Sequence, residues 1–509
     1  MDKMQRSSKS IFVICLLSAV TKMASAQDGS LDLSFDTDGI VVTSLDSSSL
    51  ANSIAIQSDG KIVVAGYRDN GIGSVNDFDF ALVRYNTNGT LDLTFGTDGI
   101  VITPIGSGSE KAEEVLIQSD GKILVAGSSH NGTNDDFALV RYNSNGTLDL
   151  TFSGDGIVTT SITAYSDRAA SLALQSDGKI LVCGRSGGSS YWSFAIVRYN
   201  TDGSLDLTFD TDGIATTSVG VYDSWASSLA VQADGKILVA GTSYGPPGRF
   251  AVVRYNSDGT LDATFDTDGM VITLIGGDAE AESIALQDDG KIVVAGTNLD
   301  GGYDADFALL RYNTNGSLDL TFNTDGIITA DIGGYGDYCN SVSIQDDGRI
   351  VVAGMDSTTF AVMRYLENGN LDNTFGSGGL VLTSFEQGNW ATSSAIQSDS
   401  KIILAGYSYN GDHYDFALAR YNATLNAEIT ETNSFDISFY PNPSDDIIYI
   451  NAGNETVSIT ILDQSGRKVF DYPNFAGSGQ IDLSSLSSGQ YLVHVTSESG
   501  ILTKPLVVK

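Results

Sequence analysis

The chain has 509 residues, and its 63 acidic against 27 basic residues give a formal net charge of -36 at pH 7. Such a charge repels phosphate backbones, so nucleic acid is excluded as an expected partner. Glycine is abundant at 56 residues and proline scarce at 7, and aromatic and β-branched residues are plentiful. This composition favours an all-β fold of many short strands joined by tight turns, and it argues against a helical protein.

The first 26 residues have the pattern of a secretory signal. Basic Lys3, Arg6 and Lys9 precede an apolar run at 11–20, and small residues end at Ala26. This arrangement predicts a signal peptide over residues 1–26 and a mature chain that starts at Gln27. Cys15 lacks the preceding small residues of a lipoprotein signal, so we expect no lipid anchor.

The sequence repeats itself seven times after this segment. Each repeat contains one "QSDGKI"-like segment, one Arg-Tyr pair and one "LDLTF"-like segment. The first marker begins at Gln57, Gln118, Gln175, Gln232, Gln287, Gln345 and Gln397. The second begins at Arg84, Arg141, Arg198, Arg254, Arg311, Arg364 and Arg420. The third places an aspartate at Asp32, Asp92, Asp149, Asp206, Asp262, Asp319 and Asp372. Repeats at a fixed period predict a repeat architecture.

Each repeat has the signals of four antiparallel strands. In the first repeat these are residues 53–57, 61–66, 79–86 and the segment 91–103. An "SDG" turn joins the first strand to the second, and a "TNG" turn joins the third strand to the segment 91–103. Four strands in roughly 57 residues match one propeller blade. The segment 31–44 is a fourth strand without its own blade, and the last repeat lacks one. We therefore predict a seven-bladed β-propeller of four-stranded blades over residues 27–428, closed by the N-terminal strand.

The order "QSDGKI…VAG…FALVRY…LDxTF" resembles the delta-60 repeats, a family of secreted bacterial propeller-type repeats. This resemblance covers nearly the whole repeat region. It implies the propeller fold but no established activity and no catalytic residue.

The C-terminal part has a different pattern. A linker is expected at 429–434, and the alternating strands of 435–509 predict a small β-sandwich domain. Its motifs "YPNPS" (440–444), "DQSGRKV" (463–469), "LSSGQYLVHV" (486–495) and "TKPLVVK" (503–509) resemble the type A sorting domain of the type IX secretion system. The resemblance implies that residues 435–509 engage the secretion machinery. We then expect a protein that is secreted or held at the outer cell surface of a Gram-negative bacterium.

The segment "FDTDGI" (35–40) has the spacing of a calcium loop, but comparison between repeats favours a turn. The slot of Asp36 holds Gly, Ser, Asn or Asp in the seven copies, residues that interchange in turns. No cofactor is expected. Calcium stays open only for the repeats that keep both carboxylates, at Asp36, Asp38, Asp210, Asp212, Asp266 and Asp268.

The repeat arginines and the cysteines are interpreted as scaffold. Seven copies of one arginine predict a charge pair within each blade, such as Arg84 with Asp92. Cys183 and Cys339 fall in slots that are alanine in the other repeats, so we predict two free thiols and no disulfide.

The two variable connections of each repeat are expected at one end of the propeller, opposite the tight turns, because antiparallel strands alternate in direction. Function usually lies in such loops. Rings among Asn, Asp and Gly suit sugar stacking or a protein contact. The candidate ligand-binding residues in or beside these loops are Tyr67, Trp192, Trp225, Tyr244, Tyr303, Trp390, Tyr409, His413 and Tyr414.

No catalytic residue is identified in the sequence, which has three histidines and no nucleophile motif. We predict a monomeric binding or adhesion module, with an extracellular glycan or a surface protein as partner. The alternative is a secreted carbohydrate-active enzyme with a carboxylate pair at the loop-rich face.

Overall fold

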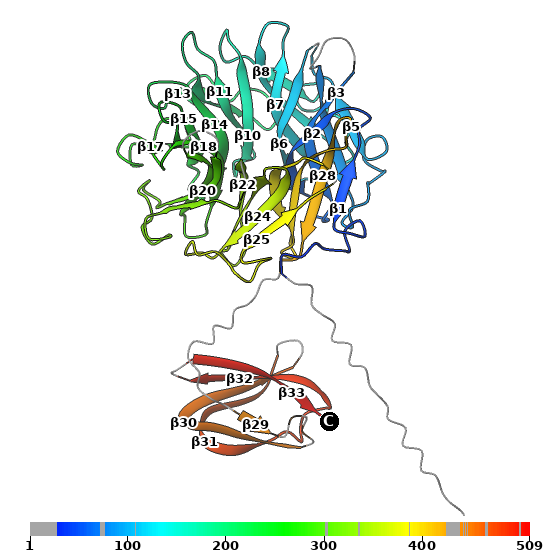
Figure 1. The fold of residues 1–509 in the computed structure, drawn as a ribbon, viewed down its shortest axis with the longest axis vertical. Helices are drawn as coiled ribbons and strands as arrows, with labels where there is room; N and C mark the ends of the chain where they lie inside the picture. The colour runs from blue at the N-terminus through cyan, green and yellow to red at the C-terminus, as the bar shows by residue number, and fades with distance from the viewer. Residues whose placement is uncertain are drawn as a thin grey trace, which may run out of the picture. The chain divides into compact units, whose positions relative to one another are not determined.

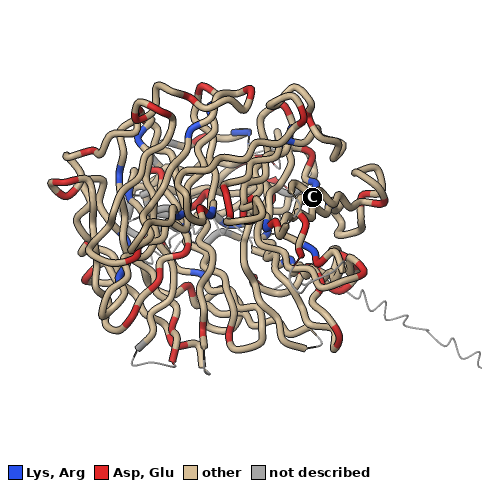
Figure 2. Tube along the Cα trace, turned by 90° about the horizontal axis from the view of Figure 1, so that it is seen from above, with Lys and Arg blue, Asp and Glu red and all other residues tan. Residues whose placement is uncertain are grey.

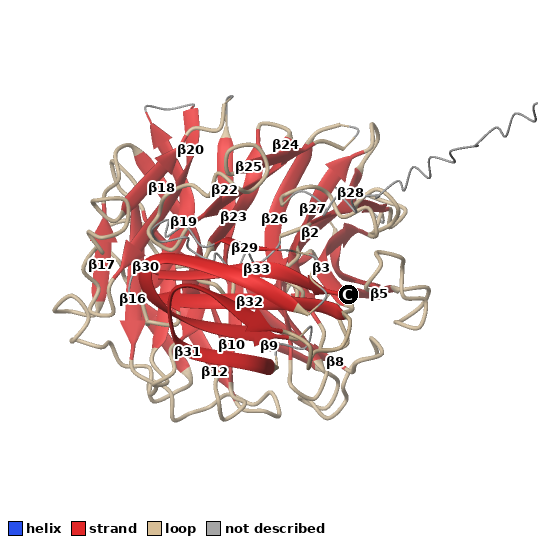
Figure 3. Cartoon of the chain, turned by 90° about the horizontal axis from the view of Figure 1, so that it is seen from below, coloured by secondary structure: helices blue, strands red, loops and turns tan. Residues whose placement is uncertain are grey.

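The computed structural model describes residues 28–71, 77–106, 108–300, 304–333, 336–385, 387–423, 438–440, 442, 444, 446–463, 467–497 and 500–509. The predicted signal peptide and linker lie outside these ranges. The chain divides between Thr424 and Leu425 into two compact units. All regular elements of the described residues are strands, as Figure 3 shows, which confirms the all-β prediction.

The first unit is a propeller of seven four-stranded sheets, as predicted (Figure 1). Each sheet is one blade, numbered here from the N-terminal side. Blade 1 consists of β2 (Ser49–Ile56), β3 (Ile62–Asp69), β4 (Phe78–Tyr85) and β5 (Ile100–Thr103). Blade 2 consists of β6 (Glu110–Ile117), β7 (Ile123–His130), β8 (Asp135–Tyr142) and β9 (Ile157–Thr160). Blade 3 consists of β10 (Asp167–Leu174), β11 (Ile180–Ser186), β12 (Ser193–Tyr199) and β13 (Ile214–Thr217). Blades 4 and 5 consist of β14 (Ser224–Val231), β15 (Ile237–Ser243), β16 (Arg249–Tyr255), β17 (Met270–Thr273); and β18 (Asp278–Leu286), β19 (Ile292–Asp300), β20 (Asp304–Tyr312), β21 (Ile327–Ala330). Blades 6 and 7 consist of β22 (Asp337–Ile344), β23 (Ile350–Asp356), β24 (Thr359–Tyr365), β25 (Leu380–Thr383); and β26 (Asn389–Ile396), β27 (Ile402–Tyr409), β28 (Tyr414–Tyr421), β1 (Ile40–Thr43).

The N-terminal strand closes the ring, as the sequence predicted. β1 pairs antiparallel with β28, with Ile40 opposite Ala419. Arg420 of β28 forms an ion pair with Asp32, at 2.8 Å. The last blade therefore joins the two ends of the propeller and has four strands, like the other six blades.

The cores of the propeller lie between neighbouring blades. Leu181 and Cys183 of β11 face the core shared with blade 4, whereas Ile180 and Val182 of the same strand face the core shared with blade 2. Because alternate side chains of this strand enter two different cores, the strand is apolar throughout. This explains the continuous apolar runs after each "QSDG" turn.

The repeat arginines hold the tight-turn end of the propeller together, which confirms the predicted charge pairs. In blade 3, Arg198 Nε lies 2.7 Å from Asp206 Oδ2, and the guanidinium lies over the Phe209 ring and donates to the Ser257 carbonyl of the next blade. The other pairs are Arg84–Asp92, Arg141–Asp149, Arg254–Asp262, Arg311–Asp319, Arg364–Asp372 and Arg420–Asp32. Because this ion pair recurs in all seven blades, it serves the propeller scaffold.

A second cation reaches the same aspartates. Lys179 Nζ lies 2.8 Å from Asp206 Oδ2, and equivalent contacts recur in the other blades. Burial opposes ionisation of Asp206, but hydrogen bonds from Lys179 and Thr208 hold its pKa well below the usual range. These carboxylates therefore stay charged at neutral pH.

The second unit is β-rich and has its own core. β29 (Ser438–Tyr440), β30 (Ile447–Leu462), β31 (Lys468–Asp482), β32 (Gly489–Ser497) and β33 (Gly500–Val508) form one hydrogen-bonded network. The long β30 pairs with β29 and β31 in its first part and with β31 and β32 in its second. Alternate residues Ile448, Ile450, Val457, Ile459 and Ile461 point into the core.

Candidate functional site

The loop-rich end of the propeller opens into a cavity on its axis. The cavity has a volume of about 1310 Å³, and residues of the innermost strands of all seven blades line it. The strand pairing confirms that the tight turns lie at the opposite end. The 57–61 turn joins β2 to β3, and the far ends of these two paired strands, at Ser49 and Arg68, lead into the variable loops. The variable loops thus surround the mouth of this central channel.

A β-bulge in each inner strand turns one residue toward the channel. The register skips one residue between Ala51 and Ser53 in blade 1 and at the same place in every other blade. All seven skipped residues line the cavity: Asn52, Glu113, Ala170, Ser227, Glu282, Asn340 and Thr392. A bulge of this kind re-aims a side chain, and here it does so seven times.

The glycine of each "VAG" segment makes this bulge possible. A Cβ on Gly184 would lie 2.0 Å from the Arg168 carbonyl oxygen, and the equivalent glycines give 1.9–2.0 Å. Only glycine permits so close an approach of two backbones. The repeated glycine is therefore a requirement of the channel wall and not of the turns.

A ring of large side chains lies just before the bulges, at the mouth; we call it the mouth ring. It consists of Leu50, Lys111, Arg168, Trp225, Glu280, Tyr338 and Trp390. All except Leu50 line the cavity. Only tryptophan occurs twice in this ring, whereas the flanking alanine and bulge-glycine slots are almost constant. The fold therefore repeats while the side chains at the mouth of the channel do not.

Hydrogen bonds between neighbouring inner strands fix the ring's spacing. The Ser171 hydroxyl accepts from the Leu229 N–H of the next blade at 3.2 Å, and Ser53, Ser228, Ser283 and Ser341 do the same in their blades. In blade 2 Glu114 takes the place of the serine and accepts from the Leu172 N–H at 2.6 Å. Bulge side chains add to this, since Asn52, Asn340 and Thr392 donate to the carbonyl groups of the next blade.

Three predicted aromatic residues lie in the channel wall: Trp225, Tyr244 and Trp390. Trp225 packs on Tyr244 with ring centroids 4.5 Å apart, and Trp390 stacks on Tyr407 at 5.3 Å. The Tyr244 hydroxyl donates to Glu280 Oε1 at 2.9 Å. These rings belong to blades 4 and 7, so they occupy separate parts of the rim.

The other predicted residues lie beside the channel wall. Tyr67 packs edge-on against Phe78, which lines the cavity, and Trp192 lies under the Arg185 guanidinium. Three candidates form a rim group on blade 7, where Tyr409 contacts Tyr414 and His413 Nε2 lies 3.2 Å from Asp415. Tyr303 lies outside the described residues.

Charged residues of the channel were missed by reasoning from the loops alone. Lys111, Arg168 and Arg185 line the cavity on blades 2 and 3, and Glu280 and Glu282 line it on blade 5. All lie within strands and not in connections. The signal was present in the sequence, because these slots differ between repeats that are otherwise closely similar.

Three channel carboxyl groups, Glu113, Glu114 and Glu282, have pKa values raised by burial. Burial raises the pKa of Glu113 to about 7, despite the opposing charges of Lys111, Arg185 and Arg168. Burial, together with the charge of Glu280, raises the pKa of Glu282 to about 8. The Glu113 and Glu282 side chains therefore hold a proton during part of the time near neutral pH, as groups that transfer protons do.

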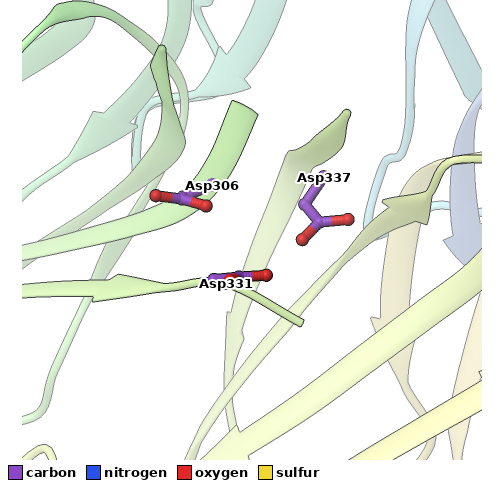
Figure 4. Close-up of side chains that lie close together, drawn as sticks. All are labelled: Asp306, Asp331 and Asp337. Carbon is purple, nitrogen blue, oxygen red and sulfur yellow. The ribbon is translucent and has the colours of Figure 1, made fainter. Parts of the chain in front are cut away.

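A separate group of acids lies between blades 5 and 6. Oxygen atoms of Asp306, Asp331 and Asp337 lie within 4.8 Å of one another (Figure 4). Asp306 belongs to β20, Asp331 follows β21, and Asp337 begins β22. Carboxylate oxygens at this spacing could hold a hard cation such as calcium. Asp337 also accepts a hydrogen bond from the Ile332 N–H at 2.9 Å, so it has a structural role in the loop.

The turns at the calcium-like segments have the geometry expected of turns. The residue in the Asp36 slot has a positive φ in all seven repeats, from 41° at Asp210 to 55° at Gly376. This left-handed conformation explains why Asp, Asn, Ser and Gly interchange there. Asp38, Asp212 and Asp268 each accept the N–H of the residue two positions later. Calcium at Asp36, Asp210 or Asp266 stays a prediction.

Both mature cysteines are buried and unpaired, as predicted. Cys183 lies in the core between blades 3 and 4, and Cys339 in the core between blades 5 and 6. Burial raises the pKa of the Cys339 thiol to about 12. These thiols are packing residues and take no part in the channel.

Comparison with protein families agrees with this architecture. The model described as "Domain of unknown function (DUF5122) beta-propeller" matches seven segments, at residues 57–95, 118–152, 175–209, 232–265, 287–322, 345–375 and 397–426. The model described as "Secretion system C-terminal sorting domain" matches residues 438–509. The chain therefore contains seven repeats of the DUF5122 β-propeller family and a secretion system sorting domain after them.

The sorting domain indicates export by the type IX secretion system to the outer surface of a Gram-negative bacterium or into its surroundings, as expected. It implies contact with the secretion machinery. Within the part of the chain that the structure describes, no helix is both long enough and apolar enough to span a membrane. No curated protein matches the chain.

Several solved structures are similar to the chain at low identity. A virginiamycin B lyase from Staphylococcus aureus is 10% identical with a TM-score of 0.43, over 75% of this chain and 98% of that one. The polysaccharide lyase Uly1 is 12% identical with a TM-score of 0.41, over 73% and 90%. A protein of unknown function from Dyadobacter fermentans is 12% identical with a TM-score of 0.40, over 76% and 98%. Scores below 0.5 carry no argument about the function of this chain.

Proposed function

We propose that the propeller is an extracellular binding module that takes a glycan into the mouth of its central channel. One observation carries the proposal: the mouth ring differs from blade to blade, although the strands around it repeat. A residue that served only the propeller would be needed equally in every blade. The divergence of these slots is what a single asymmetric ligand requires.

The chemistry of the mouth suits a sugar polymer. Trp225 and Trp390 offer apolar rings on two sides of the opening, and such rings stack on the apolar faces of sugars. Ser227 and Thr392 add hydroxyl groups from the bulge positions. A cavity of about 1310 Å³ is large enough for several sugar units and is wider than a site for one small metabolite.

The test is a glycan array on the purified full chain and on two aromatic variants. Trp225→Ala and Trp390→Ala should each reduce binding at least tenfold, because each removes a stacking surface. Tyr191→Ala is the matched control, since Tyr191 is an exposed ring outside the channel lining. Equal loss in the control, or no binding to any glycan, would refute the proposal.

A second candidate, a carbohydrate-active enzyme, rests on Glu113 and Glu282. Both line the channel, and their raised pKa values make them suitable as general acids near neutral pH. Release of reducing ends from a bound polysaccharide would favour this function. Glu113→Gln and Glu282→Gln should then abolish turnover and leave binding intact. Saturable binding without products favours the binding module.

A further inference from the structure

The cations of the mouth are not part of the repeated scaffold. Between residues 28 and 423 the chain has nineteen lysines and arginines. Fourteen of them pair with the aspartate of an "LDLTF"-like segment, two in each blade, as Arg84 and Lys61 do with Asp92. Five remain: Arg68, Lys111, Arg168, Arg185 and Arg249. Three of these five line the channel. The protein has more than twice as many acids as bases, and acidic residues are spread along the whole tube in Figure 2. The three cations share the channel lining with five acids, Glu113, Glu114, Asp135, Glu280 and Glu282.

Two of the three stand opposite each other in a way that the fold does not favour. Arg168 of β10 is the direct cross-strand partner of Arg185 of β11. Like charges in this arrangement destabilise a sheet. The same pair of slots holds uncharged or singly charged combinations in the other blades, such as Trp225 with Thr242. The propeller therefore does not need two arginines here.

Aromatic rings hold two of these cations without neutralising them. The Arg185 guanidinium lies 3.9 Å from the centroid of Trp225 and 5.0 Å from that of Trp192. Lys111 Nζ lies 5.1 Å from the centroid of Tyr67. Within the described residues no carboxylate lies within 4.0 Å of either cation. Cation–π contacts position a charge while leaving its N–H donors available.

Three acids, Glu113, Glu114 and Asp135, line the cavity beside these cations. Asp135 pairs with Arg168 at 2.7 Å and not with the other two. Glu113 lies two residues after Lys111 on β6 and accepts a hydrogen bond from Asn52 at 2.8 Å. Glu280 and Glu282 lie on blade 5, and Glu280 is held by Tyr244. Blades 2 and 3 therefore place cations and acids side by side at the mouth, and Lys111 and Arg185 are the two lining cations with no ion pair among the described residues. The acidic side of the mouth, formed by Glu280 and Glu282, lies on blade 5.

We infer that the ligand of the mouth is an acidic polysaccharide, whose carboxylate or sulfate groups are bound by Lys111 and Arg185. The inference rests on the proposed function and specifies its substrate class. Trp225 would contact the sugar ring next to the acidic group, because it packs directly against Arg185. The acidic side on blade 5 repels the same groups and so fixes the direction in which the polymer lies.

The experiment is a binding titration of the purified full chain with three polymers: a polyuronate, a sulfated galactan and neutral dextran. The first two distinguish carboxylate from sulfate, and dextran reports binding without charge. Arg185→Gln and Lys111→Gln are compared with Arg249→Gln, a cation outside the channel lining that makes the same change in net charge. Thermal melts of all variants check the fold.

We expect tighter binding of one acidic polymer than of dextran, and a decrease with added salt. Arg185→Gln should weaken that binding about ten- to hundredfold, and Arg249→Gln should leave it unchanged. Dextran binding that is lost in Trp225→Ala but not in Arg185→Gln would overturn the inference and leave the proposed function standing. Binding of no polymer would overturn both.

Discussion

The two ends of each blade differ in what they repeat. At the tight-turn end, Asp206 pairs with both Arg198 and Lys179, and the same three residue types recur in nearly every blade. At the mouth, the corresponding slots hold Arg168 in one blade and Trp225 or Glu280 in others. A sevenfold scaffold thus supports a surface with no sevenfold symmetry. The difference teaches that repetition within one chain separates residues that serve the fold from residues that serve a ligand.

The largest expected effect is on the bulge that joins the two ends. Gly184→Ala would place a Cβ 2.0 Å from the Arg168 carbonyl oxygen, which the sheet can relieve only by losing the bulge. We expect a loss of about 3 kcal/mol or more in the free energy of unfolding. Urea denaturation measures it. Gly245→Ala is the control, because its nearest neighbour would be 3.4 Å away; an equal loss in both would contradict this account of the glycine.

An arginine substitution at each end gives the next comparison. Arg198→Ala leaves the buried Asp206 with Lys179 as its one paired cation, and we expect a loss of about 3 kcal/mol in the free energy of unfolding. Arg168→Ala breaks a pair with Asp135 at the exposed mouth, where the cost is at most about 1 kcal/mol. Denaturation of both variants at pH 7 tests the contrast. Similar losses would show that the mouth is also scaffold.

A smaller effect depends on pH. Burial and the charges of Asp356, Asp331 and Asp306 raise the pKa of Asp337 to about 6. Because ionisation is harder in the folded state, this residue reduces stability as the pH rises from about 4 to about 6, and the cost persists above. Asp337→Asn should stabilise the propeller by about 1 kcal/mol at pH 8, a value reduced for solvent screening, and by nothing at pH 3.

The same variant separates the two roles of the acid group. Asparagine keeps a carbonyl oxygen for the Ile332 N–H, so the loop contact survives. Thermal melts at the two pH values, with and without calcium, make the measurement. A loss of stability in Asp337→Asn at pH 8, together with stabilisation of the unsubstituted protein by calcium, would mean that a cation occupies the group and would contradict the expected gain.

The two thiols should not react with a thiol reagent until the cores between the blades open. Cys183 and Cys339 are buried, and burial raises the pKa of both thiols well above the usual range. A thiol reagent should therefore leave the native mature protein unlabelled and modify two groups after denaturation without reductant. Rapid labelling of the native protein would show that the blade interfaces open readily.

The fold followed from the sequence because each inference could be checked in seven copies. The slot of Asp36 identified a turn, and the pairing of Arg84 with Asp92 followed from their shared repetition. Trp225, Tyr244 and Trp390 were found because their residue type draws attention. Lys111, Arg168 and Arg185 were not predicted, because the prediction selected aromatic residues of the loops, whereas these cations lie on strands β6, β10 and β11 that line the channel. The acid group of Asp306, Asp331 and Asp337 forms only when blades 5 and 6 meet in space.

The most direct test of the mouth as the binding site is hydrogen exchange of the full chain with and without the polyuronate. We predict slower exchange in the segments 162–171 and 185–193, which surround Arg168 and Arg185 at the mouth. The hairpins at 175–179 and 200–204, at the other end of the same blade, should exchange unchanged. Slower exchange confined to those hairpins would contradict the assignment of the two ends.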